Sequence, residues 1–214
     1  DFLSAYPEHD VVLPEVSDWA YGFGDFNEDS GRIEAFTPLQ FAGDVIKGGK
    51  VGSADVTGLE INALGGQTAG GQKLAVRRWI APQDGVVDIY AELLHQSEEG
   101  DGVVCHLLSS QQGRLGEWTA ANRSVLTTLT DLEVKQGEAL DFATVCRGDP
   151  KGDTYQWAPT ITMKSAEMPG MAGMAKRWDA RSNFLNPDRM PQPLGPWEEL
   201  AQVLLLSNEF IWVE

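Results

Sequence analysis

The sequence predicts an all-β fold, an antiparallel β-sandwich, from the period of its apolar residues and from the turn signals between them. Residues 87–93, VDIYAEL, alternate apolar and polar side chains, which is the period of a strand with one buried face. The Asp84-Gly85 pair before this run and the acidic, glycine-rich stretch 98–102 after it are typical of turns between strands. The centre of the chain therefore has the pattern of successive β-hairpins.

Ten short runs of this kind occur at the spacing of a sandwich. We expect strands near residues 19–24, 32–36, 58–63, 74–81, 86–95, 103–109, 115–120, 130–135, 139–147 and 155–163. The glycine-rich stretches 48–52 and 65–71 are predicted as long loops, because glycine has no side chain to pack in a strand, and they could also border a ligand.

The chain divides into four predicted segments. They are an approach segment over 1–16, the β-sandwich over 17–164, a connector over 165–195 and a C-terminal α-helix over 196–214. Pro196 suits the first turn of that helix, and the glutamate and glutamine residues after it share one face opposite a wide apolar surface. Such a surface needs a cover, so we expect the helix to pack on the β module or on a domain of a longer parent protein.

The chain is strongly acidic, with 16 Lys and Arg against 32 Asp and Glu and a formal charge of −16. A field of this sign repels the phosphates of nucleic acids and anionic membrane surfaces. No apolar run approaches the roughly 20 residues that a membrane-spanning helix needs. We therefore expect no nucleic-acid partner and no membrane insertion, and the charge favours neutral or cationic partners.

The two cysteines, Cys105 and Cys146, both fall on predicted strands in phase with large apolar neighbours, so each is expected to face the core. A disulfide between them, which implies an oxidising compartment, and a pair of buried thiols both fit this pattern. The chain contains no Cys-x-x-Cys-His sequence for attaching haem, and two cysteines with three scattered histidines make no zinc set.

The one cofactor for which the sequence offers candidate ligands is a structural calcium ion. Asp25, Asn27 and Asp29 alternate as the oxygen ligands of a calcium loop do. However, Ser30 and Phe36 occupy the positions where an EF-hand needs Gly and Glu, which favours a solvated hairpin turn.

Catalytic motifs are missing from the sequence. The carboxylates of the acidic run 98–101 are expected at a hairpin tip, where nothing would keep one of them protonated near neutral pH. The three histidines have no serine or cysteine nucleophile motif, such as G-x-S-x-G, beside them. We therefore expect a chain that is not an enzyme.

Seven tryptophans are a more specific feature, and most of them are expected to fill the core. Trp118 follows a predicted turn and is expected to be partly exposed. Sugar rings rest on aromatic planes while charged and amide side chains bind their hydroxyls, so Trp118 is the candidate platform of a glycan site. The polar residues expected beside it are Arg77, Arg78, His95 and Asp101. The alternative is that Trp118 caps the sandwich edge while the arginines form ion pairs.

Several segments of the chain resemble a known family. In chain order they are WAYGFGDFN, FTPLQFAG, LGGQTAGG, AVRRWIAPQDGVV, GDGV, GEW and DTYQWAPTI. They resemble the module near the C-terminal end of large secreted planctomycete proteins that carry cytochrome-c-like and planctomycete-specific domains. The ending PWEELAQVLLLSNEFIWVE resembles the last helix of those proteins, whereas Gln67 stands where the family is expected to have His.

The resemblance implies a carbohydrate-binding-like jelly roll in an extracellular, periplasmic or cell-surface setting, and it supplies no catalytic residue. The expected function is that of a non-catalytic accessory module that binds a polysaccharide for its parent protein. The alternative is a structural or protein-interaction β-sandwich that docks on the domains of the parent. A groove with a solvent-facing ring and converging polar groups favours the first, and a flat apolar patch favours the second.

Overall fold

The computed structural model describes residues 18–164 and 175–186, together with Trp197 and Leu200. The compact unit Ser17–Asn186 contains all the strands described below. The predicted approach segment 1–16 and, apart from those two residues, the predicted helix 196–214 lie outside the described residues. No described helix is both long and apolar enough to cross a bilayer.

The unit is built from β-strands, and each strand pairing in the described part of the chain is antiparallel. The strands are β1 (Trp19–Asn27), β2 (Arg32–Pro38), β3 (Phe41–Ala42), β4 (Val45–Lys47), β5 (Lys50–Val51), β6 (Ala54–Asp55), β7 (Glu60–Ile61), β8 (Gly65–Gln67), β9 (Lys73–Ile80), β10 (Gly85–Tyr90), β11 (Glu92–His95), β12 (Val103–Ser109), β13 (Gly113–Ala120), β14 (Arg123–Leu126), β15 (Leu129–Val134), β16 (Ala139–Cys146), β17 (Thr154–Gln156), β18 (Thr160–Met163) and β19 (Arg177–Asp179). The predicted all-β class is confirmed for these residues.

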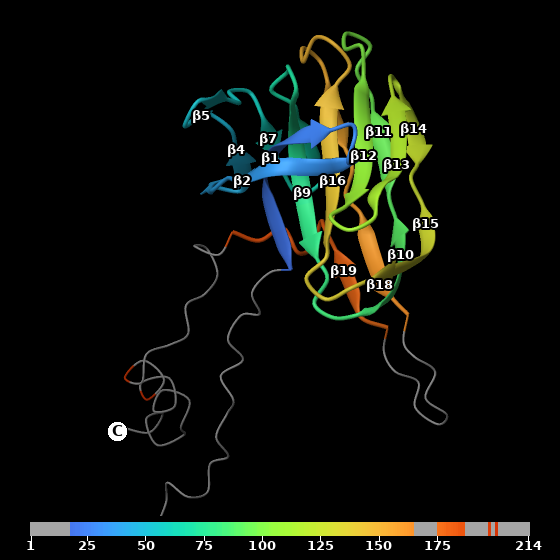
Figure 1. Ribbon diagram of the computed structural model, residues 1–214. Helices are drawn as coiled ribbons and strands as arrows, with labels where there is room; N and C mark the ends of the chain where they lie inside the picture. The colour runs from blue at the N-terminus through green and yellow to red at the C-terminus, as the bar shows by residue number, and fades with distance from the viewer. Residues whose placement is uncertain (1–17, 165–174, 187–196, 198–199, 201–214) are drawn as a thin grey trace, which may run out of the picture. The chain divides into compact units, whose positions relative to one another are not determined.

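The strands form three larger sheets and one small pair, β5-β6. The six-stranded sheet has the order β13-β12-β16-β9-β1-β2, the seven-stranded sheet β14-β11-β17-β8-β7-β4-β3 and the four-stranded sheet β15-β10-β18-β19. Only Ala91 separates β10 from β11, and residues 157–159 separate β17 from β18. The four-stranded sheet therefore continues the seven-stranded one, and Figure 1 shows β10 and β15 below β11 and β14.

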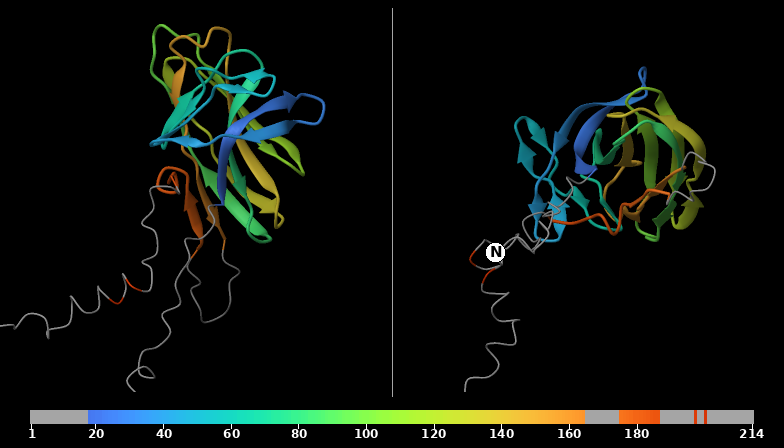
Figure 2. Two further views of the ribbon diagram at one scale, coloured as in Figure 1. Left: turned by 90° about the vertical axis from the view of Figure 1, so that its left-hand side faces the viewer. Right: turned by 90° about the horizontal axis from the view of Figure 1, so that it is seen from below.

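All three larger sheets contribute residues to one hydrophobic core. Figure 2 shows the strands of these sheets in two further views. Trp79 and Phe142 come from the six-stranded sheet, Leu93 from the seven-stranded sheet, and Ile89 and Ile161 from the four-stranded sheet. Each of these side chains is at most 2% exposed. Burying large apolar side chains between sheets is the dominant force that holds such a fold together.

A second, smaller cluster lies on the opposite face of the six-stranded sheet. Leu74 and Val76 of β9 alternate with core-facing neighbours and pack with Phe26, Ile33 and Phe36 of the β1–β2 hairpin. The central strands of this sheet are therefore covered on both faces.

All ten predicted runs contain strands, but the glycine-rich stretch 65–71 was predicted as a loop throughout, whereas its first three residues form β8. The reason is close backbone approach. A Cβ on Gly66 would stand 2.0 Å from the carbonyl oxygen of Glu60 on the neighbouring strand β7. Here glycine is required by the pairing of strands rather than by a flexible connection. The stretch 48–52 likewise contains the short strand β5.

The strand β19 lies inside the segment predicted as a connector. It pairs with the edge of β18, and the Trp178 ring packs edge-to-face on Trp79 with their centroids 5.1 Å apart. The Trp178 indole also donates a hydrogen bond to the Asp18 carboxylate, next to the start of β1. Residues 175–186 are thus packed on the main core.

Candidate functional site

The predicted platform residue Trp118 is half-buried and packs against the main core. Its ring lies edge-to-face with Trp157, with centroids 6.3 Å apart. The same ring covers Gly116, where a Cβ would stand 2.2 Å from a ring carbon. The Trp118 side chain is thus engaged in packing along the sheet edge.

The two predicted arginine ligands point to opposite faces of β9, as neighbours in a strand must. Arg77 faces inward, is 4% exposed, and donates to the backbone carbonyl oxygens of Ala180 at 3.1 Å and Asn62 at 2.8 Å. Its guanidinium carbon lies 5.5 Å from the Tyr21 ring centroid and 5.7 Å from that of Phe184. Burial lowers the Arg77 pKa, yet arginine remains charged in proteins. Arg77 therefore fastens the segment around Ala180.

Arg78, on the outer face, is already committed to a carboxylate. It binds Asp141 of β16 through two hydrogen bonds of 2.6 and 2.8 Å, and its guanidinium lies 4.1 Å from the Phe36 ring centroid. β16 and β12 separate β9 from β13, the strand of Trp118. The structure therefore does not bring the two arginines together with Trp118 into one ligand site.

His95 is fully buried and held by two polar contacts. Its Nδ1 accepts the backbone N–H of Asn122 at 3.1 Å, so the proton is assigned to Nε2, which donates to Asp153 Oδ1 at 3.0 Å. Asp153 Oδ1 also accepts the backbone N–H of Gly102 at 2.9 Å. His95 therefore holds together the loops around Gly102, Asn122 and Asp153, which form a loop cluster, and its ring is enclosed by them.

Asp101 is exposed and lies beside Asp153, so the structure joins two of the predicted residues, His95 and Asp101, through a third. Burial raises the pKa of Asp153, the Gly102 and His95 hydrogen bonds oppose that change, and the neighbouring Asp101 carboxyl adds to it. Asp153 was not predicted as a site residue. The sequence pattern could have pointed to it, because Asp153 has the same alternation as the buried residues Tyr155 and Trp157 and is therefore expected to face inward.

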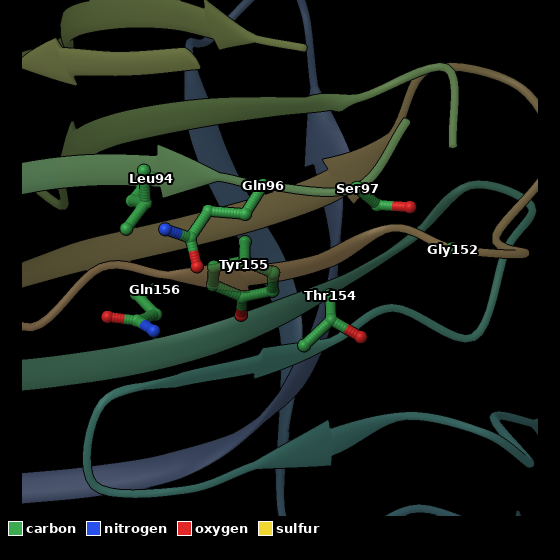
Figure 3. Close-up of a pocket in the computed structure, with 7 residues that line it drawn as sticks. All are labelled: Leu94, Gln96, Ser97, Gly152, Thr154, Tyr155 and Gln156. Atoms are coloured by element: carbon green, nitrogen blue, oxygen red, sulfur yellow. The ribbon is translucent and has the colours of Figure 1, made fainter. Parts of the chain in front are cut away.

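A surface hollow of about 360 Å³ lies next to this loop cluster, on β11, β17 and the segments that adjoin them. Its lining residues, drawn in Figure 3, are Leu94, Gln96, Ser97, Gly152, Thr154, Tyr155 and Gln156. No lining side chain carries a formal charge. Two amides and two hydroxyls, each able to donate and accept hydrogen bonds, surround the apolar Leu94.

The strand register extends this polar surface across the seven-stranded sheet. Thr154 pairs with Gln67 of β8, Gln67 pairs with Glu60 of β7, and Glu60 pairs with Lys47 of β4. Paired side chains in neighbouring strands point to the same face. Gln96, one residue beyond β11, begins the row, which therefore runs perpendicular to the strands.

The candidate calcium ligands serve the β1–β2 hairpin. Asp25 pairs with Lys73 at 2.6 Å, and Asn27 both donates to Glu34 and accepts the Ser30 backbone N–H. Asp29 lies exposed in the turn. Among the described residues, no group of three or more His, Cys, Asp or Glu side chains comes together, here or elsewhere, in a way that could hold a metal ion. Asn27 thus stabilises the hairpin turn, whereas Asp25 joins β1 to β9.

The two cysteines are buried and unbonded. Register places Cys105 opposite Thr144 and Cys146 opposite Val103, so the cysteines are diagonal neighbours on β12 and β16. Diagonal neighbours are roughly 7–8 Å apart, beyond the reach of a disulfide without backbone movement. Of the two alternatives, the structure contains the pair of thiols.

A second hollow, of about 390 Å³, lies between the β1–β2 turn and the outer face of the six-stranded sheet. In it the His106 ring stacks on Phe26 with centroids 4.7 Å apart. Burial lowers the pKa of His106, as does Arg114, whereas Glu117 and Glu28 act in the opposite direction. Two acidic residues that line it, Asp25 and Glu28, are paired with cations. The two carboxylates of this hollow are therefore already engaged in ion pairs within the protein.

Comparisons with protein-family models, with curated proteins and with solved structures give no match to this chain. The candidate site consequently rests on the geometry described above.

Proposed function

We propose that this chain is a non-catalytic carbohydrate-binding module with a jelly-roll-type β-sandwich fold, which holds a larger secreted or surface protein on a polysaccharide. The observation that carries the proposal is the uncharged hollow lined by Gln96, Gln156, Thr154 and Ser97 around Leu94. Neutral sugars present hydroxyls that amides and hydroxyls bind, and C–H faces that rest on apolar side chains.

An exposed aromatic side chain shares the outward phase of this surface. Tyr90 ends β10, is 56% exposed, and alternates on the same face as Glu92, Leu94 and Gln96. A tyrosine ring combines an apolar face with a polar end, which suits stacking on a sugar. In the proposed site Tyr90 takes the stacking role first predicted for Trp118.

Two further features support the proposal. The jelly-roll assignment rests on antiparallel sheets around one core and on the non-consecutive neighbours β16, β9 and β1 in the six-stranded sheet. The net charge of −16 disfavours nucleic acids, anionic membranes and polyanionic glycans as partners. The resemblance to planctomycete surface modules is the ground for proposing a parent outside the cytoplasm, in an extracellular, periplasmic or cell-surface setting.

The proposal is tested by screening the chain against a neutral glycan array and titrating the best ligand by calorimetry. Replacing both Gln96 and Gln156 by Ala should weaken binding about tenfold, because each hydrogen bond contributes on the order of 0.5–1.5 kcal/mol. Gln136→Ala, at an exposed turn residue between β15 and β16, is the matched control. The melting temperature should not change, since all three side chains are exposed. Absence of any neutral ligand, or full affinity in the double variant, contradicts the proposal.

One observation favours the alternative, a surface that docks on the parent's own domains. Leu126 is 62% exposed and pairs with Glu92, which places it diagonally beside Tyr90 on the outer face. Leu126→Ser distinguishes the two functions, because it should weaken docking on a parent fragment while glycan affinity stays unchanged.

A further inference from the structure

Two loops, at residues 97–102 and 148–153, meet beside the hollow and enclose one carboxylate. The backbone N–H of Gly102 donates to Asp153 Oδ1, while Arg147 N–H donates to the Gly102 carbonyl oxygen. A Cβ on Gly100 would stand 2.2 Å from Asp153 Oδ1 and 2.7 Å from the Gly152 carbonyl oxygen. The loops therefore close on Asp153 so tightly that glycine is needed at the contact.

The two oxygens of this carboxylate are treated differently. Oδ1 accepts two hydrogen bonds, from Gly102 N–H and from His95 Nε2. Oδ2 has no hydrogen-bond partner, although the Asp153 side chain is 0% exposed. A buried polar atom of this kind costs folding free energy unless something else satisfies it.

A second carboxyl group, that of Asp101, lies beside the Asp153 carboxylate. Asp101 lies within hydrogen-bonding reach of Asp153. Two ionised carboxylates only accept hydrogen bonds, so neither satisfies the other, and their like charges repel. A cation placed between them would satisfy the orphan oxygen and remove the repulsion.

We propose that Asp101 and Asp153 hold a divalent cation of the calcium type, which fastens the loops at residues 97–102 and 148–153 together beside the uncharged hollow. Only oxygen donors are available, because His95 uses both ring nitrogens in other contacts. Oxygen-only donors on irregular loops suit Ca²⁺ rather than Zn²⁺. No third acidic, Cys or His side chain joins the pair in the described part of the chain, so main-chain carbonyls and water complete the set.

The site is separate from the hairpin residues that the sequence suggested, and it does not depend on the proposed glycan binding. Its competitor is a single proton shared by the two carboxyls, which would satisfy Oδ2 without any metal. The two occupants differ in their response to calcium.

The experiment measures the melting temperature of the chelator-treated full chain with and without about 10 mM CaCl₂, at ionic strength matched with NaCl. A loop site of this kind has a Kd of about 0.1–1 mM. That calcium concentration is about ten- to a hundredfold above Kd, so the melting temperature should rise by roughly 3–10 °C.

Two variants separate the site from general screening of the acidic surface. Asp101→Asn, at an exposed residue, should be at least as stable as the parent without calcium, yet lose the calcium response. Asp149→Asn, an exposed aspartate of the same loops, should keep the full response. The proposal is overturned if calcium does not raise the parent's melting temperature, in which case the shared proton satisfies Oδ2, or if Asp101→Asn responds as the parent does.

Discussion

Replacing the buried Arg77 by Met tests what holds residues 175–186 on the core. Methionine keeps much of the apolar stem and volume but removes both hydrogen bonds to the Ala180 and Asn62 carbonyl oxygens. An unsatisfied buried carbonyl costs about 1–3 kcal/mol, and the lost contacts with the Tyr21 and Phe184 rings add about 1 kcal/mol. Relief of burying the guanidinium offsets part of this sum. The net loss of unfolding free energy should be about 2–4 kcal/mol.

Urea unfolding followed by tryptophan fluorescence measures this loss, and hydrogen exchange locates it, since amides near Ala180 should exchange first. Arg32→Met is the matched control, because Arg32 also donates to one backbone carbonyl but does so at the surface. Its cost should stay below about 0.5 kcal/mol. If Arg77→Met costs no more than Arg32→Met, the buried guanidinium does not secure the segment.

Three further predictions follow from burial. Trp118→Ala should lower the unfolding free energy by about 2 kcal/mol and leave glycan affinity unchanged, because the half-buried ring packs against the core. If calorimetry shows a loss of glycan affinity without a loss of stability, Trp118 is the sugar-stacking residue that the sequence predicted. Burial holds the folded-state pKa of His106 below its usual 6.5, so the unfolded chain binds the proton first and stability falls as the pH drops below 6.5. His106→Asn should make that fall less steep. The prediction fails if the melting temperature of the variant and that of the parent fall equally with pH. Non-reduced, denatured protein should titrate two thiols, whereas Cys105 should not react in the folded state, because burial raises its pKa to about 12; one disulfide per chain would contradict the structure.

Strands with one buried face could be predicted from the sequence. In residues 87–93, for example, the alternation of apolar and polar side chains matches the alternation of buried and more exposed positions in the structure. β8 could not be predicted, since local rules count glycine against a strand, and only the closeness of the Glu60 backbone explains it. β19 is three residues long and depends on the edge of β18 and on Arg77, which are distant in sequence. Such contacts leave no local signal.

The candidate site was predicted in fragments. The sequence singled out His95 and Asp101 but not Asp153 between them, because an aspartate near glycines is also what a solvated loop contains. The opposite directions of Arg77 and Arg78 were available from alternation alone. The inward direction of Trp118 was not, because its glycine-rich strand shows no clear phase.

The contacts of residues 175–186 also bear on how the chain reaches its folded state during synthesis. Trp178 binds Asp18, 160 residues earlier, and Arg77 binds Ala180, 103 residues later. A ribosome must therefore release nearly all of the compact unit before Asp18 meets Trp178 and Arg77 meets Ala180. Pairings over such separations slow folding and leave strand edges exposed to other chains while it proceeds. A chain that stops before Trp178 should collapse without the hydrogen bond from Arg77 to Ala180, so truncated products are expected among insoluble material.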